Sequence, residues 1–114
     1  MDIKDRIDIG KDYTDHPGAR YTGDGEWSGE RFLKEHLLPK FNKAVQNQYI
    51  LFIDLDNLTG CPTSFVSGSF GKLSIEKGAA LVLKHLQFKS EYNPIRLERI
   101  INEIKEPTKE PDEI

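Results

Sequence analysis

The sequence predicts an α/β (α+β) fold in a single domain. Three observations predict this class: a length of 114 residues, β-prone segments that alternate with segments of helical periodicity, and loops rich in glycine and proline between them. A chain of this length can build one hydrophobic core of ordinary size. We therefore expect one domain over residues 1–106, followed at 107–114 by a charged, proline-containing tail that need not be ordered.

The first predicted strand begins near Arg6. Ile7 and Ile9 alternate there with Asp8 and Gly10, and a period of two is typical of a half-buried strand. Glycine and proline then punctuate residues 14–25, which predicts a loop or an irregular hairpin.

The first predicted helix begins at Ser28, whose hydroxyl can accept a hydrogen bond from an early helix amide. Apolar residues then recur at helical spacing. They are Phe32, Leu33, Leu37, Phe41, Ala44 and Val45. Pro39 lies inside this pattern, so we expect the helix to kink there or to restart.

The clearest strand of the sequence runs from Gln48 to Asp56, a continuous apolar run rich in β-forming residues. It is expected to be central in the sheet. After a loop over residues 58–63, Ser64 is expected to cap a second helix that turns Phe65, Phe70 and Leu73 inward.

The last third of the chain predicts three elements. A short helical segment from Ala79 to Lys84, capped by Ser74, is followed by a strand from His85 to Lys89. Pro94 then lies at a favourable first helical position, and apolar residues at helical spacing extend the final helix to Ile104.

Charge and cysteine usage exclude several classes of protein. Lys and Arg number 16 against 19 Asp and Glu, a net charge of −3, and the scattered basic residues give no footprint for nucleic acid. The single cysteine, Cys61, excludes an internal disulfide and a cysteine-based zinc cluster. Without an apolar run near twenty residues we expect no membrane span, and together these features predict a cytoplasmic protein.

Two groups of residues resemble the STAS-like family of bacterial domains of unknown function, which is related in fold to the STAS anti-sigma-factor antagonists. The first holds Pro17-Gly18-Ala19-Arg20-Tyr21 and Ser28-Gly29-Glu30, and the second holds the strand ending at Asp54, Ser64-Phe65 and Phe70-Gly71. The likeness extends from about Ile7 to Ile104. It implies a mixed sheet of about four strands packed by three to four helices. It also implies a genetic context, because domains of this family are often encoded beside or joined to histidine-kinase-type ATPase domains.

The resemblance also implies a phosphorylated hydroxyl at the start of the helix after the central strand. Ser64 matches that position, Thr63 lies beside it, and Ser67 is one turn further along. A phosphate at a helix N-terminus would leave the fold intact and repel a docked partner. Where the antagonists have an acidic residue and a glycine around the serines, this chain has Pro62 and Phe65. The alternative is that Ser64 is an ordinary helix cap.

A second candidate site lies in and after the glycine-rich loop, at Arg20, Asp24, Ser28 and Glu30. Arg20 and free amides near Ser28 could hold a small anion or a nucleotide. Alternatively, Arg20 forms an ion pair with Asp24 or Glu30 that anchors the loop, and Ser28 and Glu30 only begin the helix.

A third interpretation concerns Asp54 and Asp56. A buried strand that ends in Asp-x-Asp is how haloacid-dehalogenase-type phosphatases present a nucleophile and an acid beside Mg²⁺. No acidic ligand follows at a suitable position, apart from the tail, so strand-end carboxylates that stabilise the turn are the favoured interpretation. We expect no catalytic residue.

The remaining reactive side chains predict no cofactor. His16, His36 and His85 lack the spacing of a metal site, so no metal is expected. Cys61 is either a reactive thiol at a helix start or a small apolar loop residue. Trp27 is either a partner anchor or a residue at the edge of the core.

These patterns predict a non-enzymatic signalling or protein-interaction domain. The expected partner is a protein, an ATPase, a kinase or a regulator, and it would dock on the surface around residues 61–68. A small-ligand sensor and a phosphatase-like enzyme are the alternatives.

Overall fold

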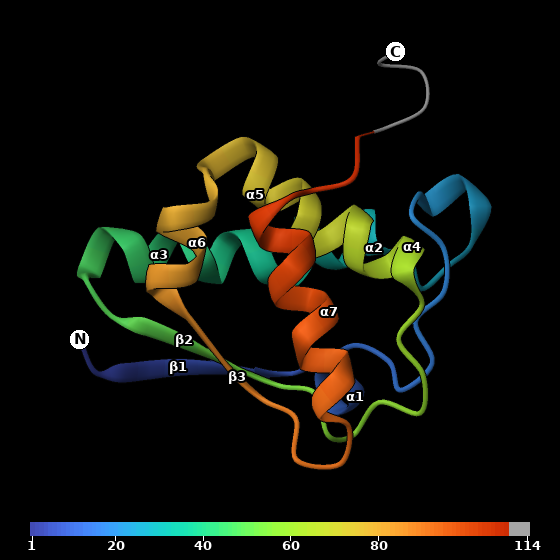
Figure 1. Cartoon of the computed structure of the whole chain (residues 1–114), viewed down its shortest axis with the longest axis horizontal. Helices are drawn as coiled ribbons and strands as arrows, with labels where there is room; N and C mark the ends of the chain where they lie inside the picture. Colours follow the sequence, from blue (N-terminus) through green and yellow to red (C-terminus); the bar gives the residue numbers. More distant parts are fainter. Residues whose placement is uncertain (110–114) are drawn as a thin grey trace.

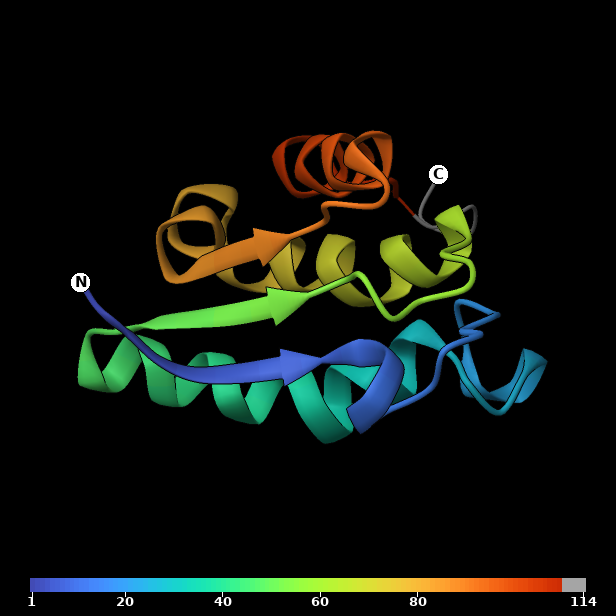
Figure 2. The ribbon, with the colours of Figure 1, turned by 90° about the horizontal axis from the view of Figure 1, so that it is seen from below.

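Three parallel strands form the sheet, in the order β1-β2-β3. A computed structural model describes residues 1–109 and places β1 at Ile3–Asp8, β2 at Ile50–Asp54 and β3 at Leu86–Lys89. Seen from below, the three arrows run side by side in one direction (Figure 2). The α/β (α+β) class is confirmed, but the expected mixed sheet of about four strands is a parallel sheet of three, because each connection between strands runs through helices.

The connection from β1 to β2 consists of short turns and one long helix. The turns are α1 (Ile9–Asp12) and the 3₁₀ segment η1 (Thr22–Asp24). The long helix comprises α2 (Gly29–Phe32), the π-helical turn η2 (Leu33–Leu37) and α3 (Leu38–Asn47).

A second long helix and a short one connect β2 to β3. The long helix comprises α4 (Thr63–Val66), the π-helical turn η3 (Ser67–Gly71) and α5 (Lys72–Lys77). The short helix is α6 (Ala79–His85), and after β3 the chain ends in α7 (Pro94–Lys105). The sheet lies along the bottom of the molecule with α2 to α6 above it, and α7 crosses in front (Figure 1).

This one-sided arrangement divides the strand residues into two classes. The side chains that face the helices are buried, with Leu51 and Ile53 at 0% exposure. Arg6, Phe52 and Gln87 are aligned in register on the other face, where the Arg6 guanidinium lies 5.6 Å from the centre of the Phe52 ring. Strands that alternate in this way expose one face of the sheet.

An aromatic cluster joins the two long helices. The Phe32 ring lies 5.5 Å from that of Phe65, 6.1 Å from Phe70 and 5.2 Å from Tyr13. All three phenylalanines are fully buried. Such tilted pairs contribute about 0.5–1.5 kcal/mol each beyond the area that they bury.

Most predicted elements are confirmed and their bounds shift. The central strand, the strand before α7 and α7 itself are confirmed. The first strand begins at Ile3 rather than near Arg6, and Ile9, expected in that strand, begins α1 because the Asp8 side chain caps this helix. The interruption expected at Pro39 takes the form of η2, the π-helical turn that ends two residues earlier.

The cap expected at Ser74 is wrong. Ser74 lies inside α5, where its Oγ donates a hydrogen bond to the carbonyl of Ile104. The break before α6 is made by Gly78 at φ +92°, in the region that favours glycine.

Two further predictions concern the C-terminal tail and membrane-spanning helices. Of the predicted tail, residues 107–109 have no regular structure and residues 110–114 lie outside the described residues. No helix within residues 1–109 combines the length and the apolarity needed to cross a membrane.

Candidate functional site

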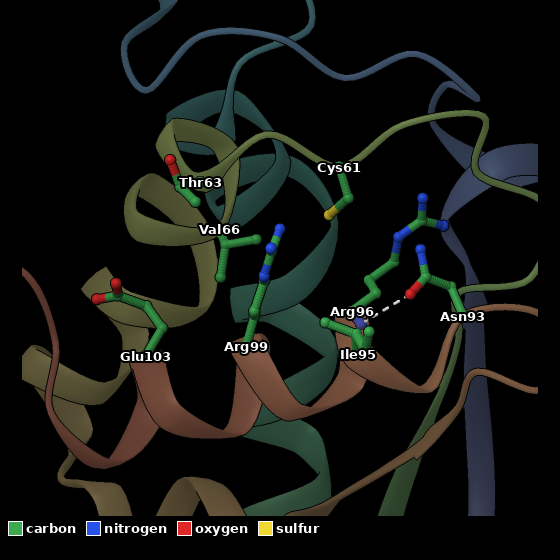
Figure 3. A pocket seen from close by; sticks show the side chains of 8 residues that line it. All are labelled: Cys61, Thr63, Val66, Asn93, Ile95, Arg96, Arg99 and Glu103. Carbon is green, nitrogen blue, oxygen red and sulfur yellow. Dashed lines mark hydrogen bonds between the residues drawn. The ribbon is translucent and has the colours of Figure 1, made fainter.

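A cavity of about 340 Å³ lies between α7 and the segment that leads into α4 (Figure 3). We call the surface around it the α4–α7 face. It is lined by Cys61, Thr63, Val66, Asn93, Ile95, Arg96, Arg99 and Glu103. It includes the start of the helix that the sequence singled out, and α7 supplies its opposite wall.

The two arginines of the α4–α7 face have different roles. Arg96 Nη1 donates to the carbonyl of Leu58 at 3.3 Å, which ties α7 to the loop after β2. The Arg99 side chain has no hydrogen bond and no ion pair with any other residue of the described part of the chain, and Figure 3 shows it directed toward the cavity. Ile95 is 61% exposed beside it. The face thus presents an available cation and an apolar side chain together.

The three candidate hydroxyls point in different directions. Thr63 is exposed and lines the α4–α7 face. Ser64 Oγ donates to the carbonyl of Gly18 at 3.1 Å. Ser67 is only 7% exposed and lines a different cavity.

The expected cap at Ser64 is therefore wrong. The helix begins one residue earlier, at Thr63, and its N-cap is Pro62, which offers no side-chain acceptor. Ser64 instead holds the loop around Gly18 against the helix. A carboxylate at position 64 would face a carbonyl oxygen rather than a helix amide, so Ser64→Asp is not the harmless change that a cap would allow.

The Ser28 cap, in contrast, is confirmed. Ser28 Oγ accepts from the amide of Arg31 at 3.1 Å, and the residue is fully buried. The next two amides, of Gly29 and Glu30, donate to the carbonyls of Ala19 and Arg20 at 2.9 Å each. An anion site built on free amides near Ser28 is therefore wrong, because these amides are already paired.

The ion pair expected for Arg20 is also wrong. The carboxylate of Glu30 accepts from the amide of Thr22 at 3.0 Å, and Asp24 is exposed in η1. Within residues 1–109 the Arg20 side chain has no ion pair. It lines a second cavity, of about 420 Å³, between η2 and η3. Backbone hydrogen bonds anchor the loop in place of the arginine.

The carboxylates at the end of β2 stabilise the local turn. Asp54 Oδ1 accepts from the amide of Asp56 at 2.9 Å, and its Oδ2 lies 3.4 Å from Arg6 Nη2. Asp56 Oδ2 lies 3.7 Å from Lys89 Nζ. In the part of the chain that the structure describes, no three His, Cys, Asp or Glu side chains form a group that could hold a metal ion.

Trp27 lies at the edge of the core. Its ring is 5.4 Å from that of Tyr13, and the guanidinium of Arg31 lies 5.0 Å from its centre. It is half-buried, so the interpretation as a core-edge residue agrees with the structure.

Cys61 is expected to be an unreactive thiol. Burial raises its pKa from 9.0 to about 11, and the charge of Arg96 offsets only part of this effect. At pH 7.5 the thiolate population is then about a hundredfold lower than that of an ordinary thiol. Alkylation by iodoacetamide should be slower by about the same factor than in the chain unfolded in urea, and should accelerate up to about pH 11. Equal rates in the folded and unfolded chain would contradict the burial of the thiol.

The α7 side of the cavity was not predicted from the sequence. Arg96 and Arg99 are three residues apart, which places them on one side of a helix, and Ile95 precedes them. This spacing can be seen in the sequence. The sequence does not show that α7 lies beside α4, because the two helices are brought together only by the fold.

Comparison with protein families places residues 28–96 in a family described as a STAS-like domain of unknown function. The matched part begins at the Ser28 cap and ends at Arg96. It includes Thr63, Ser64 and Ser67 but not the loop with Arg20 and Asp24, so it is narrower than the likeness expected from Ile7 to Ile104. No curated protein and no solved structure matches the chain.

Proposed function

The chain belongs to the STAS-like family of domains of unknown function, and from this premise we propose that it is a non-enzymatic interaction domain that docks a signalling protein on its α4–α7 face. This location refines the surface predicted around residues 61–68. Residues 61, 63 and 66 line the face, whereas Ser67 and Gly68 line the second cavity.

The observation that supports the proposal best is that Ile95 and Arg99 line the same cavity. Ile95 is an exposed large hydrophobic residue, and the Arg99 side chain has no hydrogen bond or ion pair with any of residues 1–109. Arginine and apolar side chains around a concave surface are common at the energetic centre of protein interfaces. A partner that fits this face presents an acidic side chain next to an apolar one.

The class of the partner follows from the family resemblance. STAS-like domains are often encoded beside histidine-kinase-type ATPase domains, so an ATPase or a serine kinase of this type is the partner that we propose. Thr63 is then the hydroxyl that best fits a regulatory phosphorylation. It is exposed on the face, while Ser64 is bonded to Gly18 and Ser67 is buried.

Calorimetric titration with a histidine-kinase-type ATPase domain tests the proposal. Arg99→Glu is expected to weaken binding at least tenfold, because it places a like charge against the acidic partner. Ile95→Ala should weaken it severalfold. Lys43→Glu, an equal charge change at an exposed position of α3, is the matched control and should bind like the wild type. Equal weakening by Lys43→Glu and Arg99→Glu would place the partner elsewhere or reduce the effect to net charge.

The phosphatase-like alternative has a separate test. We expect no Mg²⁺-dependent phosphate release from p-nitrophenyl phosphate or ATP by the purified chain, since Asp54 is engaged by Arg6 and by the turn. Turnover that disappears in Asp54→Asn would establish an enzyme and contradict the non-enzymatic proposal.

A further inference from the structure

The second cavity lies where two π-helical turns face each other. Its walls include Leu33 of η2 and Ser67 and Gly68 of η3, and its volume is about 420 Å³. This volume is within the range of small-molecule sites. Single π-helical turns inside α-helices are rare and frequently occur at functional sites. Here two of them border one cavity.

Ser67 supplies a polar group that the protein itself does not use. The residue is 7% exposed, and its hydroxyl has no hydrogen bond with any part of residues 1–109. Asp56 Oδ2 is the only side-chain nitrogen or oxygen within residues 1–109 that is both fully buried and without a hydrogen bond, so the unbonded Ser67 hydroxyl remains accessible to a molecule in the cavity that it lines. Ser69, two residues along, differs from Ser67 in this respect, because its Oγ donates a hydrogen bond to the carbonyl of Phe65 at 2.7 Å.

Arg20 supplies a cation at the same cavity. Its side chain has no ion pair within the described residues, as shown above, and its Cγ lies beside Gly68, 3.0 Å from where a Cβ would be. The other charged residues around the cavity are Lys34 and Lys72, and Glu30 and Glu76. Together with Arg20, the described residues that line the cavity carry three positive and two negative charges, and one of the positive residues, Lys72, has a further interaction of its own. One of these carboxylates, that of Glu30, is occupied by the amide of Thr22.

The backbone beneath Arg20 is held firmly. A Cβ on Gly68 would lie 2.7 Å from the Arg20 carbonyl oxygen, and the same oxygen accepts from the amide of Glu30 at 2.9 Å. Close backbone packing of this kind fixes the position from which the side chain extends. A site held in place before binding loses less entropy on binding.

We propose that this cavity binds a small amphipathic anion, a carboxylate or phosphate group attached to an apolar body. The anionic group pairs with Arg20 and accepts a hydrogen bond from Ser67 Oγ. The apolar body packs on Leu33, Leu38 and Ile75, of which Ile75 is 46% exposed. The site is separate from the α4–α7 face, and neither depends on the other.

Titration of the ¹⁵N-labelled chain followed by amide chemical shifts tests the site. The probes are benzoate, phenyl phosphate, benzyl alcohol as the uncharged body, and inorganic phosphate as the anion alone. Benzoate or phenyl phosphate should give saturable shifts concentrated at Leu33, Ser67 and Gly68, and the stronger of the two identifies the anionic group. Benzyl alcohol and inorganic phosphate should each bind at least tenfold more weakly.

Variants separate a ligand site from a structural role. Arg20→Gln should weaken the better probe at least tenfold and Ser67→Ala severalfold, while Arg20→Lys should restore part of the loss and Lys43→Gln should change nothing. Thermal unfolding checks that each variant is folded. The proposal is overturned if neither anion saturates any shift, if the shifts map to another surface, or if Arg20→Gln and Ser67→Ala bind like the wild type.

Discussion

Replacement of Gly29 by alanine is expected to destabilise the protein by about 3 kcal/mol, near the upper end of what overpacking usually costs. A Cβ at this position would lie 2.4 Å from the carbonyl oxygen of Phe65 and 2.9 Å from the carbonyl carbon of Gly68. Both are backbone atoms of the second long helix, so they cannot give way by changing a rotamer. The two helices would have to move apart along their whole contact.

Chemical denaturation of Gly29→Ala against the wild type measures this loss. Gly23→Ala is the matched control, because no atom lies within 4 Å of the Cβ that it would add. Its stability should stay within about 0.5 kcal/mol of the wild type. Similar midpoints for Gly29→Ala and Gly23→Ala would show that the two helices do not approach as closely as described.

Truncation of Phe32 to alanine is expected to cost about 3–5 kcal/mol. The ring is fully buried, and its neighbours come from two separate segments, Tyr13 after α1 and Phe65 and Phe70 of the second long helix. Neither of these segments can close the cavity by itself, so most of it remains empty. Thermal or urea unfolding would show the loss as a lower midpoint.

The control for Phe32 is an aromatic residue outside the core. Tyr92 is 84% exposed, so Tyr92→Ala should change the unfolding midpoint little. A loss below about 1 kcal/mol in Phe32→Ala would mean that the aromatic cluster does not join the long helices.

The elements predicted well are those whose own residues determine them. In the run that contains Ile50–Asp54, the residues that point to both faces of the strand are apolar, and the run is too short for a buried helix. Its position in the centre of the sheet could therefore be predicted from composition. The last helix has a proline at its start and an apolar stripe along its length, and both are local signals.

The side-chain roles were predicted less well, because their partners are remote in sequence. Ser64 bonds to a carbonyl 46 positions away, and no local pattern reveals such a contact. The Ser28 cap was found because its partner is three residues along. For Arg20 the same preference for local partners led to a wrong prediction, an ion pair with a carboxylate close to it in the sequence. In the fold, the carboxylate of Glu30 accepts a hydrogen bond from the amide of Thr22 instead.

The two π-helical turns are reflected in the sequence by the spacing of apolar residues, which was interpreted as ordinary helical spacing. Phe65 and Phe70 are both fully buried and are five residues apart, whereas residues on one side of an α-helix are three or four apart. Phe32 and Leu37 show the same interval and the same burial. A buried pair five apart in an otherwise regular helix predicts a widened turn.

The widened turns also determine where this chain can lose a residue. Deletion of one residue within 67–71 would bring Phe65 and Phe70 to four residues apart, the spacing that keeps two side chains on one side of a regular α-helix. Leu73 and Ser74, now buried against the rest of the fold, would therefore keep their side of the helix, but the widened turn that borders the second cavity would be lost. In a regular part of either helix, where each amino acid advances the helix by about 100°, the same deletion would turn the buried residues that follow away from the core. A deletion at the exposed residues 22–24 has neither effect on the long helices.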